Sequence, residues 1–174
     1  MAITINGTGN GKINNTSFST TTGNAVTTGD SGTVTEGMLS SDFIEEGTWT
    51  PTFGGTNAST GQSYSNQTGY YKKVGPLVYV QTRLTLTNKG TMSGGTIANI
   101  RGLPFTHGTG SGRSGNFSFN SWDNINNSTY SIMSFVITGG SIFLTKNATG
   151  SAVDLTDITN SSGVDISGLY YTDE

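Results

Sequence analysis

The sequence lacks most of the side chains that proteins use for covalent and metal chemistry. It has no cysteine and a single histidine, His107, in 174 residues, and only 11% of the residues are charged. Without cysteine there is no disulfide, no thiolate metal ligand and no cysteine nucleophile. A lone imidazole, with no second nitrogen or thiolate donor beside it, is a poor basis for a zinc site. We therefore expect no enzyme activity, no cofactor and no thiolate or zinc site.

Low charge and short apolar runs exclude two further kinds of partner. The net charge is −3 with only 8 lysines and arginines, whereas nucleic-acid binding needs a basic surface. The N-terminal stretch MAITINGTGNGK has neither the basic start nor the apolar run of a secretory signal, and no apolar run is long enough to cross a bilayer. We expect no nucleic-acid partner and no membrane insertion.

The chain is rich in glycine, with 26 residues, and in threonine, serine and asparagine, and it carries 8 phenylalanines, 7 tyrosines and 2 tryptophans. Good helix formers are scarce, so the composition favours strands and turns. It predicts an all-β protein, an antiparallel β-sandwich of jelly-roll-like type. The supply of aliphatic side chains is small, which favours burial of the remaining apolar surface against further copies of the chain.

Alternation of apolar and polar residues becomes clear from residue 48 onward. The predicted strands span residues 48–53, 63–74, 77–87, 96–100, 116–122, 129–138, 141–146, 151–155 and 165–172. In LVYVQTRLTLT, residues 77–87, every second residue from Val78 to Leu86 lies on one face, which we expect to be the core face. Hairpin turns are predicted at Gly75-Pro76 and, with two residues, at Gly139-Gly140.

The chain divides by composition near residue 45. Residues 1–45 are mostly small and polar and predict an extended N-terminal arm that binds another protein, while residues 46–174 form the sandwich domain. Within the domain, residues 106–115 form a long glycine-rich loop.

Three motifs are more simply explained as turns and loops. Residues 110–115 spell GxGxxG but precede a strand instead of a helix, so they do not predict a dinucleotide site. Residues 29–32, GDSG, have no histidine in the order that a serine protease requires. Asp154 and Asp157, with Asn160, leave open a calcium site, although solvated turn residues are the simpler interpretation.

A binding surface for carbohydrate is the remaining possibility. Aromatic rings pack on the faces of sugars while amides and carboxylates bond their hydroxyl groups. Trp122, Asp123 and Asn124, in a predicted loop, have this composition. With His107 and Arg113 from the glycine-rich loop, they are the predicted glycan or receptor contacts.

One part of the chain resembles a known family. The stretches EEGTWTP (45–51), TGYYKKVGPLVYVQ (68–81), LTLTNKG (84–90) and IRGLPF (100–105) are similar to a segment that recurs in virion fibre proteins of tailed bacteriophages. Gly75-Pro76 stands where the family more usually has Gly-Asn. The resemblance covers about a third of the chain and implies a homotrimeric β-sandwich that its N-terminal arm, residues 1–45, holds to a tail, baseplate or capsid protein.

These observations favour a structural protein of the virion. The first hypothesis is a trimeric fibre protein that attaches to a host-surface glycan through loops in residues 106–128 and 147–163. The alternative is a capsid decoration or head-fibre protein that binds or stabilises the shell. A glycan depolymerase is a third hypothesis, which needs two carboxylates at a suitable distance.

Overall fold

The computed structural model describes residues 43–55, 60–94, 97–110, 115–126, 132–137, 140–146 and 152–174. The chain divides into two units, residues 1–39 and 40–174, and the description concerns the second. Its strands are β1 (Ile44–Trp49), β2 (Thr52–Gly54), β3 (Ser63–Val74), β4 (Leu77–Asn88), β5 (Asn99–Arg101), β6 (Asn116–Ile125), β7 (Ile132–Ile137), β8 (Ser141–Lys146) and β9 (Ile158–Tyr171). No helix occurs in this part of the chain, and hence none that could cross a membrane.

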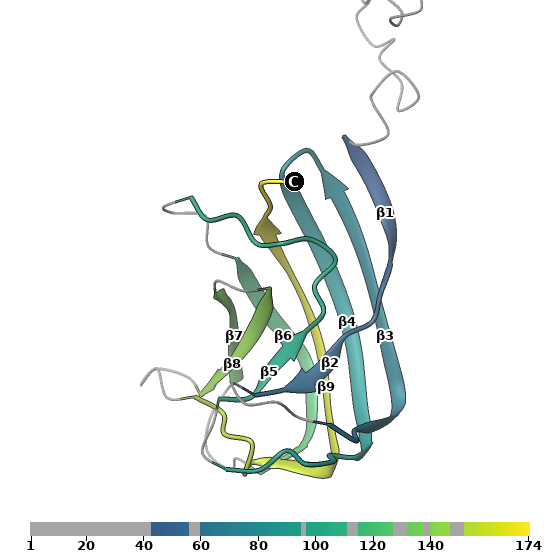
Figure 1. The fold of residues 1–174 in the computed structure, drawn as a ribbon, viewed down its shortest axis with the longest axis vertical. Helices are drawn as coiled ribbons and strands as arrows, with labels where there is room; N and C mark the ends of the chain where they lie inside the picture. The colour runs from purple at the N-terminus through teal and green to yellow at the C-terminus, as the bar shows by residue number, and fades with distance from the viewer. Residues whose placement is uncertain are drawn as a thin grey trace, which may run out of the picture. The chain divides into compact units, whose positions relative to one another are not determined.

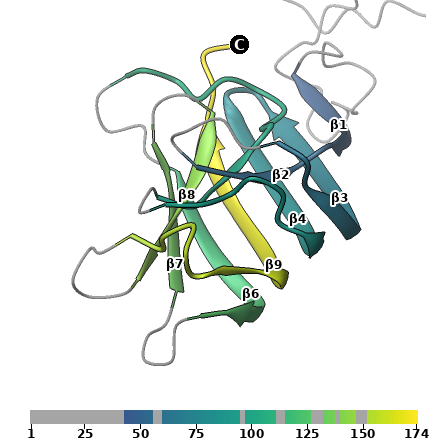
Figure 2. The same ribbon diagram turned by 60° about the horizontal axis from the view of Figure 1, so that its bottom comes forward.

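The strands form one continuous antiparallel sheet in the order β1-β3-β4-β9-β6-β7-β8-β5-β2, folded on itself (Figure 1). Strands β1, β3, β4, β9 and β6 make up one layer, here called the long-strand layer. Strands β7, β8, β5 and β2 make up the other, the short-strand layer (Figure 2). Among the described residues, strands β6 and β7 pair at Phe117 and Ser134, and the sheet turns from one layer to the other there. The predicted all-β antiparallel sandwich is confirmed.

The two ends of the sheet are joined through Pro51. Strand β1 ends at Trp49 in the long-strand layer, and β2 begins at Thr52 in the short-strand layer, so the chain crosses between layers at this corner (Figure 1). Proline has no amide hydrogen to donate, so the hydrogen-bond ladder between paired strands is interrupted at Pro51. The Gln67 side chain donates to the Pro51 carbonyl at 2.9 Å and fixes the corner. The prediction of one strand over residues 48–53 is therefore wrong, because the proline divides it in two.

Strand β4 supplies the centre of the core. Its alternate residues Val78, Val80, Thr82, Leu84 and Leu86 are buried, as predicted from the alternation. Tyr170 of β9 lies opposite Val78 and is fully buried. Its hydroxyl accepts from the Phe105 amide at 3.2 Å and donates to the Phe105 carbonyl at 3.1 Å, which ties the segment after β5 to the core. Burial raises the pKa of this hydroxyl, so the neutral form is the one present at ordinary pH.

Glycines in the long-strand layer lie under aromatic rings. Three cross-strand pairs share this arrangement: Gly47 with Tyr71, Gly69 with Trp49, and Gly168 with Phe117. A Cβ at these glycines would lie 2.9 Å, 2.5 Å and 2.6 Å from the nearest ring atom. Each ring thus occupies the space over a residue without a side chain and fills the core-facing side of the sheet.

The hairpins occur where they were predicted, with one difference of length. Val74 pairs with Leu77 across Gly75-Pro76, and Gly75 has a φ of 54°, which glycine adopts without strain. In the second hairpin Ile137 pairs with Ser141, so three residues separate β7 from β8 instead of the predicted two.

Two of the predicted strands differ from the structure in extent. The prediction of a strand at 151–155 is wrong: Ala152 and Asp154 make isolated bridges, and a turn follows. Strand β9 begins at Ile158, well before the predicted residue 165, because the polar residues of ITNSSG give no alternation to detect.

The predicted boundary between arm and domain falls inside a strand. Strand β1 begins at Ile44, two residues before the predicted start at residue 46, and Phe43 already bonds through its carbonyl to the Gly75 amide at 2.7 Å. The rest of the predicted arm lies outside the described residues.

We expect the glycine under Trp49 to be required for stability. In Gly69→Ala the new methyl group would overlap the indole, and overpacking of this kind costs about 1–3 kcal/mol in the free energy of unfolding. Gly163→Ala is the matched control, because the nearest atoms to its new methyl group are at 3.3 Å and 3.4 Å. Urea unfolding of both variants measures the difference. Equal stability of the two would show that the ring does not depend on the glycine.

Candidate functional site

The side of the long-strand layer that faces away from the short-strand layer, here called the outer face, carries an ordered set of side chains. Cross-strand pairing of β3, β4 and β9 arranges them in rows. From the β3–β4 turn, the four rows hold Val74, Leu77 and Tyr171; Lys72, Tyr79 and Leu169; Tyr70, Gln81 and Ser167; and Thr68, Arg83 and Asp165. Adjacent rows are about 6.6 Å apart, because each is two residues along a strand. The first two rows are largely apolar and the last two largely polar.

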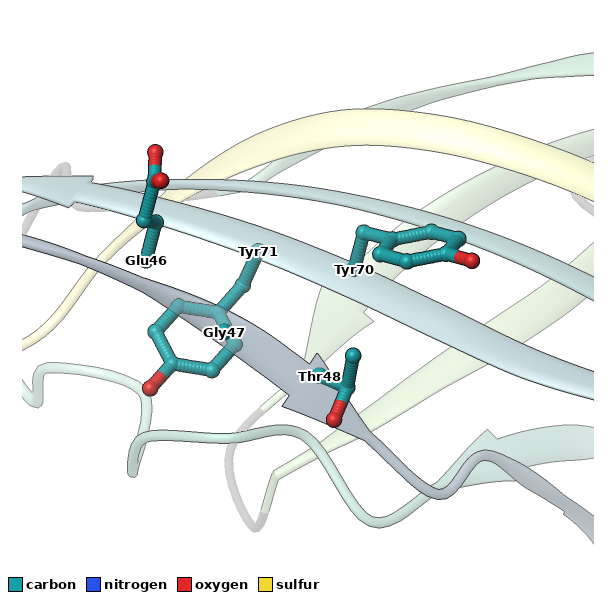
Figure 3. Close-up of a pocket in the computed structure, with 5 residues that line it drawn as sticks. All are labelled: Glu46, Gly47, Thr48, Tyr70 and Tyr71. Carbon is teal, nitrogen blue, oxygen red and sulfur yellow. The ribbon is translucent and has the colours of Figure 1, made fainter.

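Tyr70, in the third row, is the most exposed large hydrophobic residue among the described residues, at 58%. Its ring borders three hollows of about 410, 240 and 200 Å³. The largest is lined by Glu46, Gly47, Thr48, Tyr70 and Tyr71. Figure 3 shows Tyr70 and Glu46 on one side of β3, with the ring of Tyr71 on the other, over Gly47. Tyr70 is therefore an aromatic platform with open space around it on a rigid sheet.

Polar groups beside Tyr70 are free to bind a ligand. Gln81 lies directly opposite Tyr70, and Arg83 lies in the next row. Among the described residues, the side chains of these three make no hydrogen bond or ion pair with one another or with their neighbours. Asp165, opposite Arg83, accepts a bond from Asn120 Nδ2 at 3.0 Å. The site thus combines an exposed ring with an amide and a guanidinium, a set suited to sugar hydroxyls and to acidic groups.

Tyr71 is held in place from the opposite side of β3. Its ring packs edge-on against Phe105, with centroids 5.3 Å apart, and its hydroxyl donates to the Glu45 carboxylate at 2.7 Å. This bond to Glu45 raises the pKa of the Tyr71 hydroxyl above 10.0, and burial and the negative charge of Glu45 add to the effect. Glu46, the next residue, is on the outer face and pairs with Lys72 at 3.3 Å.

The predicted glycan contacts Trp122, Asp123 and Asn124 do not form a loop. They lie in strand β6, and this part of the prediction is wrong because a bulge near Asn120 lets the strand continue to Ile125. Asn124 has a φ of 50° and donates to the Ser161 carbonyl at 3.2 Å, so it shapes a second bulge.

Trp122 remains exposed but on the other side of the sheet from Tyr70. It is 41% exposed and contacts Phe119 edge-on at 6.2 Å. It pairs with Val164, a buried residue, whereas Tyr70 belongs to the row of Gln81 and Ser167. One ligand cannot contact both rings across the sheet.

His107 is buried, which differs from the predicted exposed loop residue. It is 9% exposed, stacks on Tyr170 with centroids 6.4 Å apart, and forms a bridge with Thr172. Neither of its ring nitrogens has a hydrogen-bond partner among the described residues. Along β9, Thr172 is eight residues from Val164, the partner of Trp122, which is about 26 Å. The structure therefore does not bring His107 and Trp122 together, and Arg113 lies outside the described residues.

The possible calcium ligands have other partners. The Asp157 carboxylate accepts from the Asp154 amide at 3.0 Å, and the Asp157 amide donates to the Asp154 carbonyl at 2.9 Å, so the two close a turn. Asn160 accepts from the Lys89 amide at 3.0 Å. Within the described ranges no group of three or more acidic, histidine or cysteine side chains could hold a metal ion.

The sequence contained a signal for Tyr70, which the predicted contacts did not include. Two adjacent tyrosines on a regular strand must point to opposite faces, so one of Tyr70 and Tyr71 had to be outside. The alternation could not identify the hollows, which depend on the neighbouring strands.

Comparison with known proteins supports the fold. No family model matches the sequence, and no curated protein sequence matches it either. Among solved structures, the crystal structure of the Dettilon tailspike protein (gp208) is similar, with a TM-score of 0.58 at 17% identity. The match covers 74% of this chain but only 24% of that one, so this chain corresponds to about a quarter of the tailspike chain. At this identity the similarity is one of fold.

We expect the contact between Tyr71 and Glu45 to be visible in a pH titration. In Glu45→Gln the negative acceptor is lost, so the pKa of Tyr71 falls toward 10.0. Phenolate absorbance against pH measures the change, and Tyr71→Phe identifies the transition. Glu46→Gln is the control, because Glu46 is on the outer face and bonds to Lys72. A Tyr71 transition that is the same in Glu45→Gln and the unchanged protein would contradict the assignment.

Proposed function

We propose that the protein is a fibre protein of a tailed-bacteriophage virion that attaches to a host-surface glycan through Tyr70 and the polar residues beside it. It acts as a homotrimer, and residues 1–45 bind it to another virion protein. It binds without catalysis. The observation that carries the proposal is the exposed Tyr70 ring, bordered by three hollows on a rigid sheet.

The chemistry of the outer face supports a carbohydrate ligand. A sugar ring packs on an aromatic face and offers hydroxyl groups to amides and other polar side chains. Tyr70 supplies the ring and Gln81 the amide, while the Arg83 guanidinium suits a carboxylate or phosphate of an acidic glycan. The hollows are shallow and open, so the affinity of a single site is low. Several copies on one particle compensate by avidity.

The position of the Tyr70 site on a sheet face changes the hypothesis that loops of the fibre protein contact the receptor. Loops in residues 106–128 and 147–163 were predicted to contact the receptor, but residues 116–125 are strand β6 and residues 158–163 belong to β9. A sheet face holds its side chains more rigidly than a loop does, which lowers the entropy lost on binding.

The virion assignment has two independent supports. One is the resemblance of residues 45–105 to a segment of phage fibre proteins. The other is the similarity in fold to a tailspike protein. The tailspike comparison favours a tail over a capsid location, and the decoration hypothesis is therefore the second choice.

We expect Tyr70→Ala to weaken adsorption of the full-length protein to susceptible cells by at least ~10-fold, as for removal of an aromatic anchor. Fluorescently labelled protein, titrated on cells, gives the apparent affinity. Trp122→Ala is the control, because it removes a second exposed aromatic ring, 41% exposed, on the other side of the sheet. Unchanged cell binding of Tyr70→Ala would refute the proposed site. Loss of cell binding in Trp122→Ala alone would support the site predicted from the sequence.

We also expect antibody against the protein to label the tail of intact particles. Gold-conjugated antibody and electron microscopy give the location directly. Label over the head would favour a decoration protein, in which case loss of the protein should be tested for its effect on shell stability.

A further inference from the structure

The first two rows of the outer face form an exposed apolar patch beside the Tyr70 site. The patch consists of Val74, Leu77, Tyr79, Leu169 and Tyr171. Val74, Tyr79, Leu169 and Tyr171 are 42%, 42%, 43% and 41% exposed. They are contiguous, because Val74 pairs with Leu77, Leu77 with Tyr171, and Tyr79 with Leu169. An almost wholly apolar hollow of about 220 Å³ lies among four of the five residues and Lys72.

We propose that this patch is the surface on which a second copy of the chain docks. The inference deepens the proposed function by locating the contact between copies of the fibre protein. It depends on the apolar patch and not on Tyr70, so its failure would leave the proposed receptor site unaffected.

The size of the patch fits a contact between copies. Four of the five residues are about 40% exposed and Leu77 is half-buried, so at ~150–250 Å² per aromatic side chain the patch presents at most roughly 400 Å². The largest patch on a typical monomer is ~300–600 Å², and such patches are often functional. A standard interface buries about 800 Å² per partner, of which the apolar core is the larger part in homo-oligomers. The patch supplies that core.

The charges around the patch favour another copy over a partner of opposite charge. Lys72 borders the patch, and its ammonium pairs with Glu46 at 3.3 Å. The charge of Lys72 at the patch is thus matched by that of Glu46. A partner selected by charge would need an excess of one sign, whereas an identical chain meets no like-charge repulsion here.

By sedimentation equilibrium the full-length protein should have a mass well above the 18.1 kDa of one chain, three times that value for the homotrimer proposed above. Tyr79→Lys puts a charge in the centre of the patch and should raise the dissociation constant between copies by at least ~30-fold, as for a central interface residue. Thr87→Lys is the matched control. It lies on the same strand, eight residues or about 26 Å away, and is exposed, so it should leave the mass unchanged.

A cross-linking experiment guards against a variant that misfolds. The chain has no cysteine, so Leu169→Cys carries a single thiol, and a thiol cross-linker can join it only to another copy. We expect a product of twice the chain mass with Leu169→Cys and little with Thr87→Cys.

Three outcomes would overturn the inference. A wild-type protein that stays a single chain at all concentrations would exclude self-association. If a photoreactive group at residue 79 then labelled residues 1–42 of the same chain, the N-terminal arm would be what covers the patch. Assembly that resists Tyr79→Lys would place the interface elsewhere. Binding of a different protein from the particle, with no self-association, would identify a virion partner. To test the receptor site separately, the Tyr79→Lys variant and the unchanged protein are immobilised at the same density and compared for cell binding. Loss of self-association then does not change the number of sites that a cell meets.

Discussion

The long-strand layer depends on aromatic rings that lie over glycines of the adjacent strand. Trp49 covers Gly69, Tyr71 covers Gly47 and Phe117 covers Gly168, each directly across a strand pair. A ring that fills the space of two side chains lets a chain with few aliphatic residues close the inner side of its sheet. The glycines are thus part of the packing, and the high glycine content does not indicate a loose chain.

The same packing determines what faces outward. Because Tyr71 is directed inward over Gly47, its neighbour Tyr70 must point to the outer face, with Gln81 and Arg83 of β4 beside it. The inner contact between Tyr71 and Glu45 fixes the strand pair that carries Tyr70. The candidate site is therefore a consequence of core packing, and its rigidity comes from the core.

The sequence predicted the long, regular strands well and the irregular features poorly. Residues 63–74 and 141–146 match β3 and β8, and the core face of β4 is correct, because alternation is a local property. The corner at Pro51 was missed although proline is a local signal that ends a hydrogen-bond ladder, and the start of β9 was missed because its polar residues show no alternation. The bulge at Asn120 was missed because it depends on the pairing of β6 with β9, which is distant in the sequence. The predicted contacts failed to converge for the same reason: the distance between His107 and Trp122 follows from the length of β9.

The two halves of the outer face can serve different purposes because strands are stiff and their rows are evenly spaced. The midpoint of the apolar rows is about 13 Å from the midpoint of the polar rows, four residues along each strand. A copy docked on Tyr79 and Leu169 would therefore leave Gln81 and Arg83 open, next to the seam between chains. Receptor groups of neighbouring copies would then lie close together, and weak shallow sites would act jointly through a raised effective concentration. On the proposed arrangement, the affinity for a host surface would arise from the geometry of assembly, and no single deep pocket would be needed.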